Sequence, residues 1–136
     1  MHIDPTRPQF DLFKSLPRDT QIDMLNLIRL RGQAAYPDGR VASGAEAYAA
    51  YGRESAPIFQ KVGGTILWRG RPEALVIGPD AEAWDIAFIA RYPSASSFLA
   101  MVTDPVYQAA VIHRQAAVAD SRLIRTAEQP GADRFG

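Results

Sequence analysis

The sequence predicts an α+β fold, a four-stranded antiparallel sheet with helices on one face. Segments with the apolar patterns of strands and helices follow one another in the order β-α-β-β-α-β. The length of 136 residues is enough for one domain with one hydrophobic core. Two of the strand segments are apolar on both faces, which indicates that both sides of the sheet are covered.

The chain is expected to open with an extension that contains a short helix over 8–15. A strand over 22–31 follows, and its side chains alternate between two faces. One face carries Met24, Asn26, Ile28 and Leu30, and the other carries Leu25 and Leu27. The alternation alone leaves open which of the two faces meets the helices.

The next element is a helical stretch. It is expected to begin after Ser43, which is a good N-cap residue. Ser55 is expected to cap a second helical turn, because proline is tolerated early in a helix and Pro57 follows closely. The pair Gly63 and Gly64 then ends the stretch.

Two further strands follow this helical stretch. The strand over 65–70 leads through a loop or irregular hairpin over 71–83 to a strand over 84–92. Like the first strand, the one over 84–92 has two apolar faces. One face carries Trp84, Ile86, Phe88 and Ala90, and the other carries Ala87 and Ile89.

The last part of the chain predicts two helical segments and a strand. Ser94 is expected to cap a helix over 95–103, and Asp104 with Pro105 restarts the helix over 106–119. A final strand over 121–128 completes the pattern.

These elements divide the chain into an extension over 1–20, a folded domain over 21–128 and a flexible tail over 129–136. Their order is the split βαβ pattern of ferredoxin-like folds. Helices can cover only one face of such a sheet, so a second copy related by a two-fold axis is expected to cover the other. The predicted assembly is therefore a homodimer of the dimeric α+β barrel type.

The composition excludes several classes of function. Fifteen Lys and Arg residues balance fifteen Asp and Glu residues, so no bulk charge attracts nucleic acid or an anionic membrane. The chain has no cysteine and two histidines, which makes a metal site unexpected. No segment has the length and apolar character of a signal peptide or a membrane span, so a cytoplasmic protein is expected.

Three segments resemble a known family: "MLNLIRLR", "AYAAYGRESAPIFQKVGG" and "FIARYPSASSFLAMVTDPVYQAAVIHRQAAVADSRLI". The chain is similar, over about residues 20–127, to the bacterial domain-of-unknown-function family 1330 of the dimeric α+β barrel superfamily. The most specific positions are Pro57 with Gly63 and Gly64, and Tyr107 and Gln108 followed by Arg114 and Ser121. The resemblance implies a two-fold dimer with a cavity between sheet and helices, and it implies no settled reaction.

The same superfamily includes antibiotic-biosynthesis monooxygenases, haem-degrading oxygenases, muconolactone isomerases and chlorite dismutases, so the fold does not select a chemistry. The haem-degrading relatives use an asparagine in the first strand, which Asn26 matches. Tyr92 stands where their tryptophan is expected, and Val111 where their histidine is expected. We therefore expect no haem and no other fixed cofactor.

Two polar residues lie within apolar patterns and are candidate ligand-binding residues. Arg114 sits in the middle of the apolar stripe of its helix, where a guanidinium needs either a structural partner or an anionic ligand. Asn26 can donate to and accept from a ligand, or bond to the backbone or to water. We expect the two to share one polar pocket.

Four further residues complete the candidate site. His113 is the candidate general base at the cavity rim, with a spectator role as the alternative. Arg29 is either an anion contact or a side chain that reaches into water. Tyr51 and Trp68, like Tyr48, are core aromatics that could also line a pocket.

The leading hypothesis is a small-molecule enzyme that acts on a compact anionic or carbonyl-bearing metabolite without a fixed cofactor. The alternative is a non-catalytic protein, either a ligand-binding dimer or a purely structural one. A cavity lined by Asn26 and Arg114 favours ligand binding, whereas a solid core with Arg114 paired to a carboxylate favours a structural role.

Overall fold

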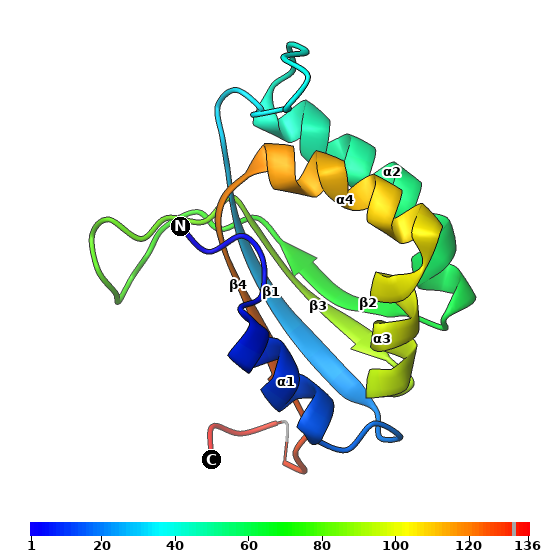
Figure 1. Cartoon of the computed structure of the whole chain (residues 1–136). Helices are drawn as coiled ribbons and strands as arrows, with labels where there is room; N and C mark the ends of the chain where they lie inside the picture. Colours follow the sequence, from blue (N-terminus) through cyan, green and yellow to red (C-terminus); the bar gives the residue numbers. More distant parts are fainter. Residues whose placement is uncertain (132) are drawn as a thin grey trace.

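The computed structural model describes residues 1–131 and 133–136, and its elements follow the predicted order (Figure 1). The helices are α1 (Arg7–Ser15), α2 (Gly44–Lys61), α3 (Ala95–Thr103) and α4 (Pro105–Ala117). The strands are β1 (Ile22–Leu30), β2 (Thr65–Gly70), β3 (Ile86–Tyr92) and β4 (Val118–Thr126). The predicted tail over 129–136 includes residue 132, which lies outside the described residues.

The four strands form one antiparallel sheet in the order β2-β3-β1-β4. The helices lie on one face of this sheet, with α2 and α4 side by side (Figure 1). The two strands that are apolar on both faces, β1 and β3, are the central ones. The predicted ferredoxin-like α+β fold is confirmed.

Two hydrophobic clusters fill the space between sheet and helices. Met24 belongs to the first cluster, with residues of α3 and α4, and Ile28 belongs to the second, with residues of α2 and α4. The face of β1 that carries Met24, Asn26 and Ile28 therefore meets the helices. Leu25 and Leu27 point to the opposite face, which none of the helices among the described residues covers.

This open face has an apolar centre and a charged rim. The pairing places Leu25 opposite Ile89 of β3 and Ile124 of β4, and Trp68 of β2 also pairs with Ile89. Ion pairs close the two ends of the face, Asp23–Arg91–Glu128 at one end and Asp120–Arg122–Glu82 at the other. Trp68 is 53% exposed and Ile124 48% exposed, so the apolar centre is only partly covered in one protomer.

The helix α2 differs from the prediction, because it is continuous where a second capped turn was expected. Its N-terminus has the predicted cap, with Ser43 and Glu46 bonded reciprocally. Pro57 lies inside the helix, and Ser55 donates its hydroxyl to the carbonyl oxygen of Tyr51 instead of capping a new turn. The prediction was wrong because a serine in the interior of a helix can donate its hydroxyl to the carbonyl oxygen four residues earlier.

The end of α2 is set by its two glycines. Gly63 has φ of +84°, a conformation that glycine adopts at little cost. A Cβ on Gly64 would lie 2.3 Å from the ring of Phe59, so a larger residue at this position would displace that ring. The chain can therefore turn directly into β2.

The boundary between α4 and β4 also differs from the prediction. Asp104 caps α4 as expected. The helix ends at Ala117, however, and β4 begins at Val118, three residues earlier than predicted. A register shift at the end of β1, between Arg29 and Leu30, lets Val118 pair with Leu30. Such irregularities depend on the partner strand and leave no local signal.

The short helix α1 packs on the same side of the sheet as the other helices. Phe13 contacts the first hydrophobic cluster, with its ring 5.1 Å from that of Phe98. Arg125 of β4 donates hydrogen bonds to the carbonyl oxygens of Phe13 and Pro17.

In the part of the chain that the structure describes, no helix is long and apolar enough to cross a membrane.

Candidate functional site

Asn26 lies in a row of four side chains that crosses the helix side of the sheet. Strand pairing places it opposite Phe88 of β3 and Leu123 of β4, and Phe88 opposite Arg69 of β2. We call Arg69, Phe88, Asn26 and Leu123 the Asn26 row. Arg69 was not among the residues predicted from the sequence, because only the strand register brings it into line with Asn26.

The Asn26 row is less buried than the positions on either side of it. Met24 is 3% exposed and Ile28 is fully buried, whereas Asn26 is half-buried and Leu123 is 44% exposed. Phe88 packs against both hydrophobic clusters, so the row marks the boundary between them. The cover over the sheet is incomplete at this boundary.

Aromatic side chains from the helices face the same boundary. Tyr51 packs against the first cluster and Tyr48 against the second, and their rings lie 5.4 Å apart. The hydroxyl oxygens of Tyr51 and Tyr107 are 2.7 Å apart. Burial raises the pKa of both Tyr51 and Tyr107, and the nearby charge of Arg114 opposes this rise. These hydroxyls therefore stay protonated and can donate hydrogen bonds.

The amide of Asn26 is only partly engaged. Its Nδ2 donates to the carbonyl oxygen of Met24 over 3.1 Å. This bond stays within β1 and does not reach Arg114. Both residues nevertheless lie on the helix side of the sheet, because Arg114 donates to Ser121, which pairs with Ile28.

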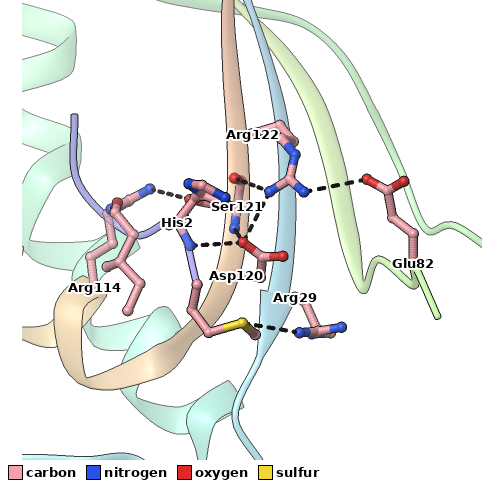
Figure 2. Close-up of polar contacts among 9 residues, drawn as sticks. His2, Arg29, Glu82, Arg114, Asp120, Ser121 and Arg122 are labelled. Carbon is pink, nitrogen blue, oxygen red and sulfur yellow. Dashed lines mark hydrogen bonds and ion pairs between the residues drawn. The ribbon is translucent and has the colours of Figure 1, made fainter. Parts of the chain in front are cut away.

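Arg114 is held by the N-terminal segment (Figure 2). Its Nη1 donates to the carbonyl oxygen of Ile3 over 2.5 Å, and its Nη2 donates to Oγ of Ser121 over 3.3 Å. The nearest carboxylate is that of Asp4, 3.9 Å away and 52% exposed. The guanidinium is thus satisfied mainly by neutral oxygen atoms and does not form a buried ion pair.

Two neighbouring residues of β4 hold the backbone of His2 (Figure 2). The backbone N–H of His2 donates to Asp120 over 2.9 Å, and Ser121 donates its hydroxyl to the carbonyl oxygen of His2 over 2.7 Å. The N–H of His2, followed by Arg122, lowers the pKa of Asp120 to about 2. No sequence pattern predicts this contact, because it joins positions at opposite ends of the chain.

His113 lies in a different environment from the Asn26 row. Its Nδ1 is 2.6 Å from the hydroxyl of Tyr36, and its Nε2 is 2.8 Å from a carboxylate oxygen of Glu54 on α2. The guanidinium of Arg40 stacks over the ring of Tyr36 at 4.4 Å. A carboxylate on one nitrogen and a hydroxyl on the other fix the orientation of the imidazole. Tyr36 and Glu54 were not predicted from the sequence.

The remaining predicted residues lie on the open face of the sheet. Arg29 is at the end of β1, and its Nη2 is 3.9 Å from Sδ of Met1. Trp68 pairs with Ile89 and points away from the helices. The structure therefore brings Asn26, Arg114 and Tyr51 to one side of the sheet, and places Arg29 and Trp68 on the other.

No metal site is evident in the described ranges 1–131 and 133–136, because nowhere there do three or more His, Cys, Asp or Glu side chains gather as ligands. An open hollow lies beside the β2 end of the Asn26 row. It is lined by Arg69, Gly70, Arg71, Asp85 and Ile86.

Comparisons with known proteins agree with this architecture. Residues 41–127 match the family described as Domain of unknown function (DUF1330). The RPA0582 protein of unknown function from Rhodopseudomonas palustris has a similar solved structure. It is 55% identical, with a TM-score of 0.90 over 95% of this chain and 98% of that chain. No curated protein matches the chain.

More distant structures share the fold. A dimeric ferredoxin-like protein of unknown function from Thermobifida fusca is 18% identical, with a TM-score of 0.53 over 83% of this chain and 96% of that chain. SnoaB, a cofactor-independent oxygenase from Streptomyces nogalater, is 15% identical, with a TM-score of 0.52 over 83% of this chain and 98% of that chain. At these identities the likeness shows a common fold.

Proposed function

Since this chain belongs to the DUF1330 family, in which the fold is known and the reaction is not, we propose that it is a homodimeric small-molecule enzyme. Its ligand is a compact anionic or carbonyl-bearing metabolite that lies over the Asn26 row, on the helix side of the sheet. SnoaB supports this proposal only as an example of an enzyme on the same fold.

The observation that carries the proposal is the incomplete cover over Asn26. A polar amide at the centre of a sheet is normally fully buried with its partners satisfied, or else replaced by an apolar residue. Here Asn26 is half-buried and its neighbour Leu123 is 44% exposed, between two positions that are almost completely buried. A ligand over this row would complete the packing between the two clusters.

The surrounding groups suit a ligand with a negative or developing negative oxygen. The hydroxyls of Tyr51 and Tyr107 share one hydrogen bond, which leaves one of their two protons for a ligand. The Nδ2 of Asn26 keeps a second N–H beside the one that it donates to Met24. Arg114 supplies a positive charge, and Phe88 provides an apolar floor. Donors that are already oriented stabilise charge on a ligand oxygen without reorganisation.

Self-association is part of the proposal. The open face presents Leu25, Leu27 and Ile89 at its centre, and a second copy would bury them. The similar structures include proteins described as dimeric and ferredoxin-like. An interface of ordinary size buries roughly 800 Å² on each partner, which is the scale of one sheet face.

A ligand screen tests the proposal. Small carboxylates, keto acids and phenolic carbonyl compounds are each added to the protein, and the melting temperature is measured against ligand concentration. We expect one class to raise the melting temperature, because a ligand at 100 times its Kd stabilises the fold by about 2.7 kcal/mol.

The matched variants are Asn26→Leu and Gln108→Leu. Both replace an amide by leucine, but Gln108 is an exposed residue of α4. Asn26→Leu should abolish the shift and Gln108→Leu should leave it unchanged. Equal shifts in both variants would place the ligand elsewhere. Turnover of the ligand that binds then separates an enzyme from a non-catalytic binding protein.

A further inference from the structure

The connection between β2 and β3 forms an arm that extends away from the body of the protein (Figure 1). We define the arm as residues 71–83. The sequence predicts only a loop or irregular hairpin here, and the function proposed above makes no use of it.

The tip of the arm is apolar and faces water. Val76 is 90% exposed and Ile77 is 91% exposed, and the preceding Leu75 is 46% exposed. Single exposed apolar residues are common, but three in succession at the end of a protruding segment form an apolar patch whose hydration is unfavourable. Such a patch is typical of a surface that binds another protein.

The root of the arm is fixed to the open face. Glu82 forms an ion pair with Arg122 of β4 over 3.6 Å (Figure 2). The guanidinium of Arg122 also lies 5.1 Å from the ring centre of Trp84. Arg122 pairs with Leu27, so its side chain belongs to the open face. The backbone N–H of Leu30 also donates to Asp85 over 2.7 Å.

The root of the arm is fixed to the open face and its apolar tip is uncovered. The arm is therefore placed to contact a molecule that covers the open face. We propose that this occupant is a second copy of the chain, and that Leu75, Val76 and Ile77 of each protomer clasp the other. The proposal rests on the homodimer proposed above and adds a contact outside the sheet. The charged residues of the arm all lie outside its apolar tip, so the contact made by the tip is apolar. They are one basic residue, Arg71, and three acidic residues, Glu73, Asp80 and Glu82.

The first test compares two exposed apolar sites by analytical ultracentrifugation across a dilution series. The arm variant is Val76→Asp with Ile77→Asp. The control is Val41→Asp, because Val41 is 86% exposed and lies in the loop before α2. We expect the arm variant to raise the dimer dissociation constant at least tenfold and the control to leave it unchanged.

The outcomes separate the arm from the dimer. If the wild type is a dimer and the arm variant has the same dissociation constant, the arm contact is overturned and the homodimer proposal is unaffected. A wild type that is monomeric at every concentration overturns both. A circular dichroism spectrum and melting temperature equal to those of the wild type establish that the arm variant is folded.

A second test uses the absence of cysteine from the chain. Ile77→Cys and Val41→Cys each introduce one thiol, whose reaction with a maleimide is timed at high and low protein concentration. In the dimer we expect the thiol at position 77 to react at least tenfold more slowly than the thiol at position 41. On dilution to monomer, the reaction rate at position 77 should approach the rate at position 41. Equal rates at all concentrations would contradict the clasp.

Discussion

Arg114 donates to the main-chain carbonyl of Ile3 across 111 positions of sequence, so the inward arginine of α4 is satisfied by the N-terminal segment. No buried carboxylate is needed to balance it. The carbonyl of Ile3 and the hydroxyl of Ser121 occupy directions in which a ligand oxygen could also approach. An anionic ligand at Arg114 therefore competes with the first residues of the chain.

We expect Arg114→Met to cost about 2 kcal/mol of unfolding free energy, because two hydrogen bonds from a charged donor are lost. This is less than the 3 to 5 kcal/mol typical of breaking a buried ion pair. Urea denaturation measures the change, with Arg53→Met on the exposed side of α2 as the control. A loss above about 4 kcal/mol would show that Arg114 balances a buried charge after all.

The Asn26 row predicts coupled effects on ligand binding. Arg114→Met should weaken an anionic ligand roughly ten- to a hundredfold, which is the usual effect of losing a charge-assisted hydrogen bond. Asn26→Leu should weaken it too, and the double variant should lose less than the sum if both residues hold one ligand. Isothermal titration calorimetry of the four proteins measures the coupling. Strict additivity would indicate separate sites.

Asp120 predicts a loss of stability in acid. Its pKa is lowered from 3.8 to about 2 in the folded state, so the fold favours the ionised carboxylate. The resulting stabilisation, about 2 kcal/mol, is complete above about pH 4 and disappears as the pH falls through 2. Denaturation at several pH values should show this slope in the wild type and a shallower one in Asp120→Asn. The control is Asp19→Asn, at an exposed position.

His113 predicts a kinetic test once a substrate is found. If it acts as a general base through Tyr36, His113→Ala should lower kcat by about 10² to 10⁴. Tyr36→Phe should lower kcat in the same direction. Unchanged turnover in both variants, with a reduced melting temperature, would assign the Glu54–His113–Tyr36 chain to structure alone.

The open face predicts a dimer of twice 14.9 kDa in solution. Leu27→Asp places a charge at the centre of this face and should shift the population toward monomer at micromolar concentration. Leu12→Asp is the control, since Leu12 is 63% exposed on α1. Light scattering measures both masses, and a wild-type mass near that of one chain would exclude the proposed homodimer.

The sequence predicted the elements well because their signals are local. Ser43, Ser94 and Asp104 cap the helices where expected. The two strands that are apolar on both faces, β1 and β3, are the central strands of the sheet. Local signals also explain the errors. Pro57 has the pattern of a helix start, although α2 continues through it.

The candidate site was harder to predict because its parts meet only in three dimensions. The alternation of side chains in β1 does not determine that Asn26 faces the helices. Arg69 is aligned with Asn26 only through two strand pairings, β1 with β3 and β3 with β2. The partners of Arg114 and His113 lie far away in sequence, Ile3 for the first and Tyr36 and Glu54 for the second. Spacing within one helix carries no information about such partners.

The charged rim of the open face has a kinetic consequence. Its six side chains are already paired within one protomer; they are Asp23, Arg91, Glu128, Asp120, Arg122 and Glu82. They are four carboxylates and two guanidiniums, so the rim of each protomer carries a net negative charge and two approaching copies repel each other at long range. Association should not exceed the unsteered rate of about 10⁵ to 10⁶ M⁻¹s⁻¹, and it should become faster as rising ionic strength screens the repulsion.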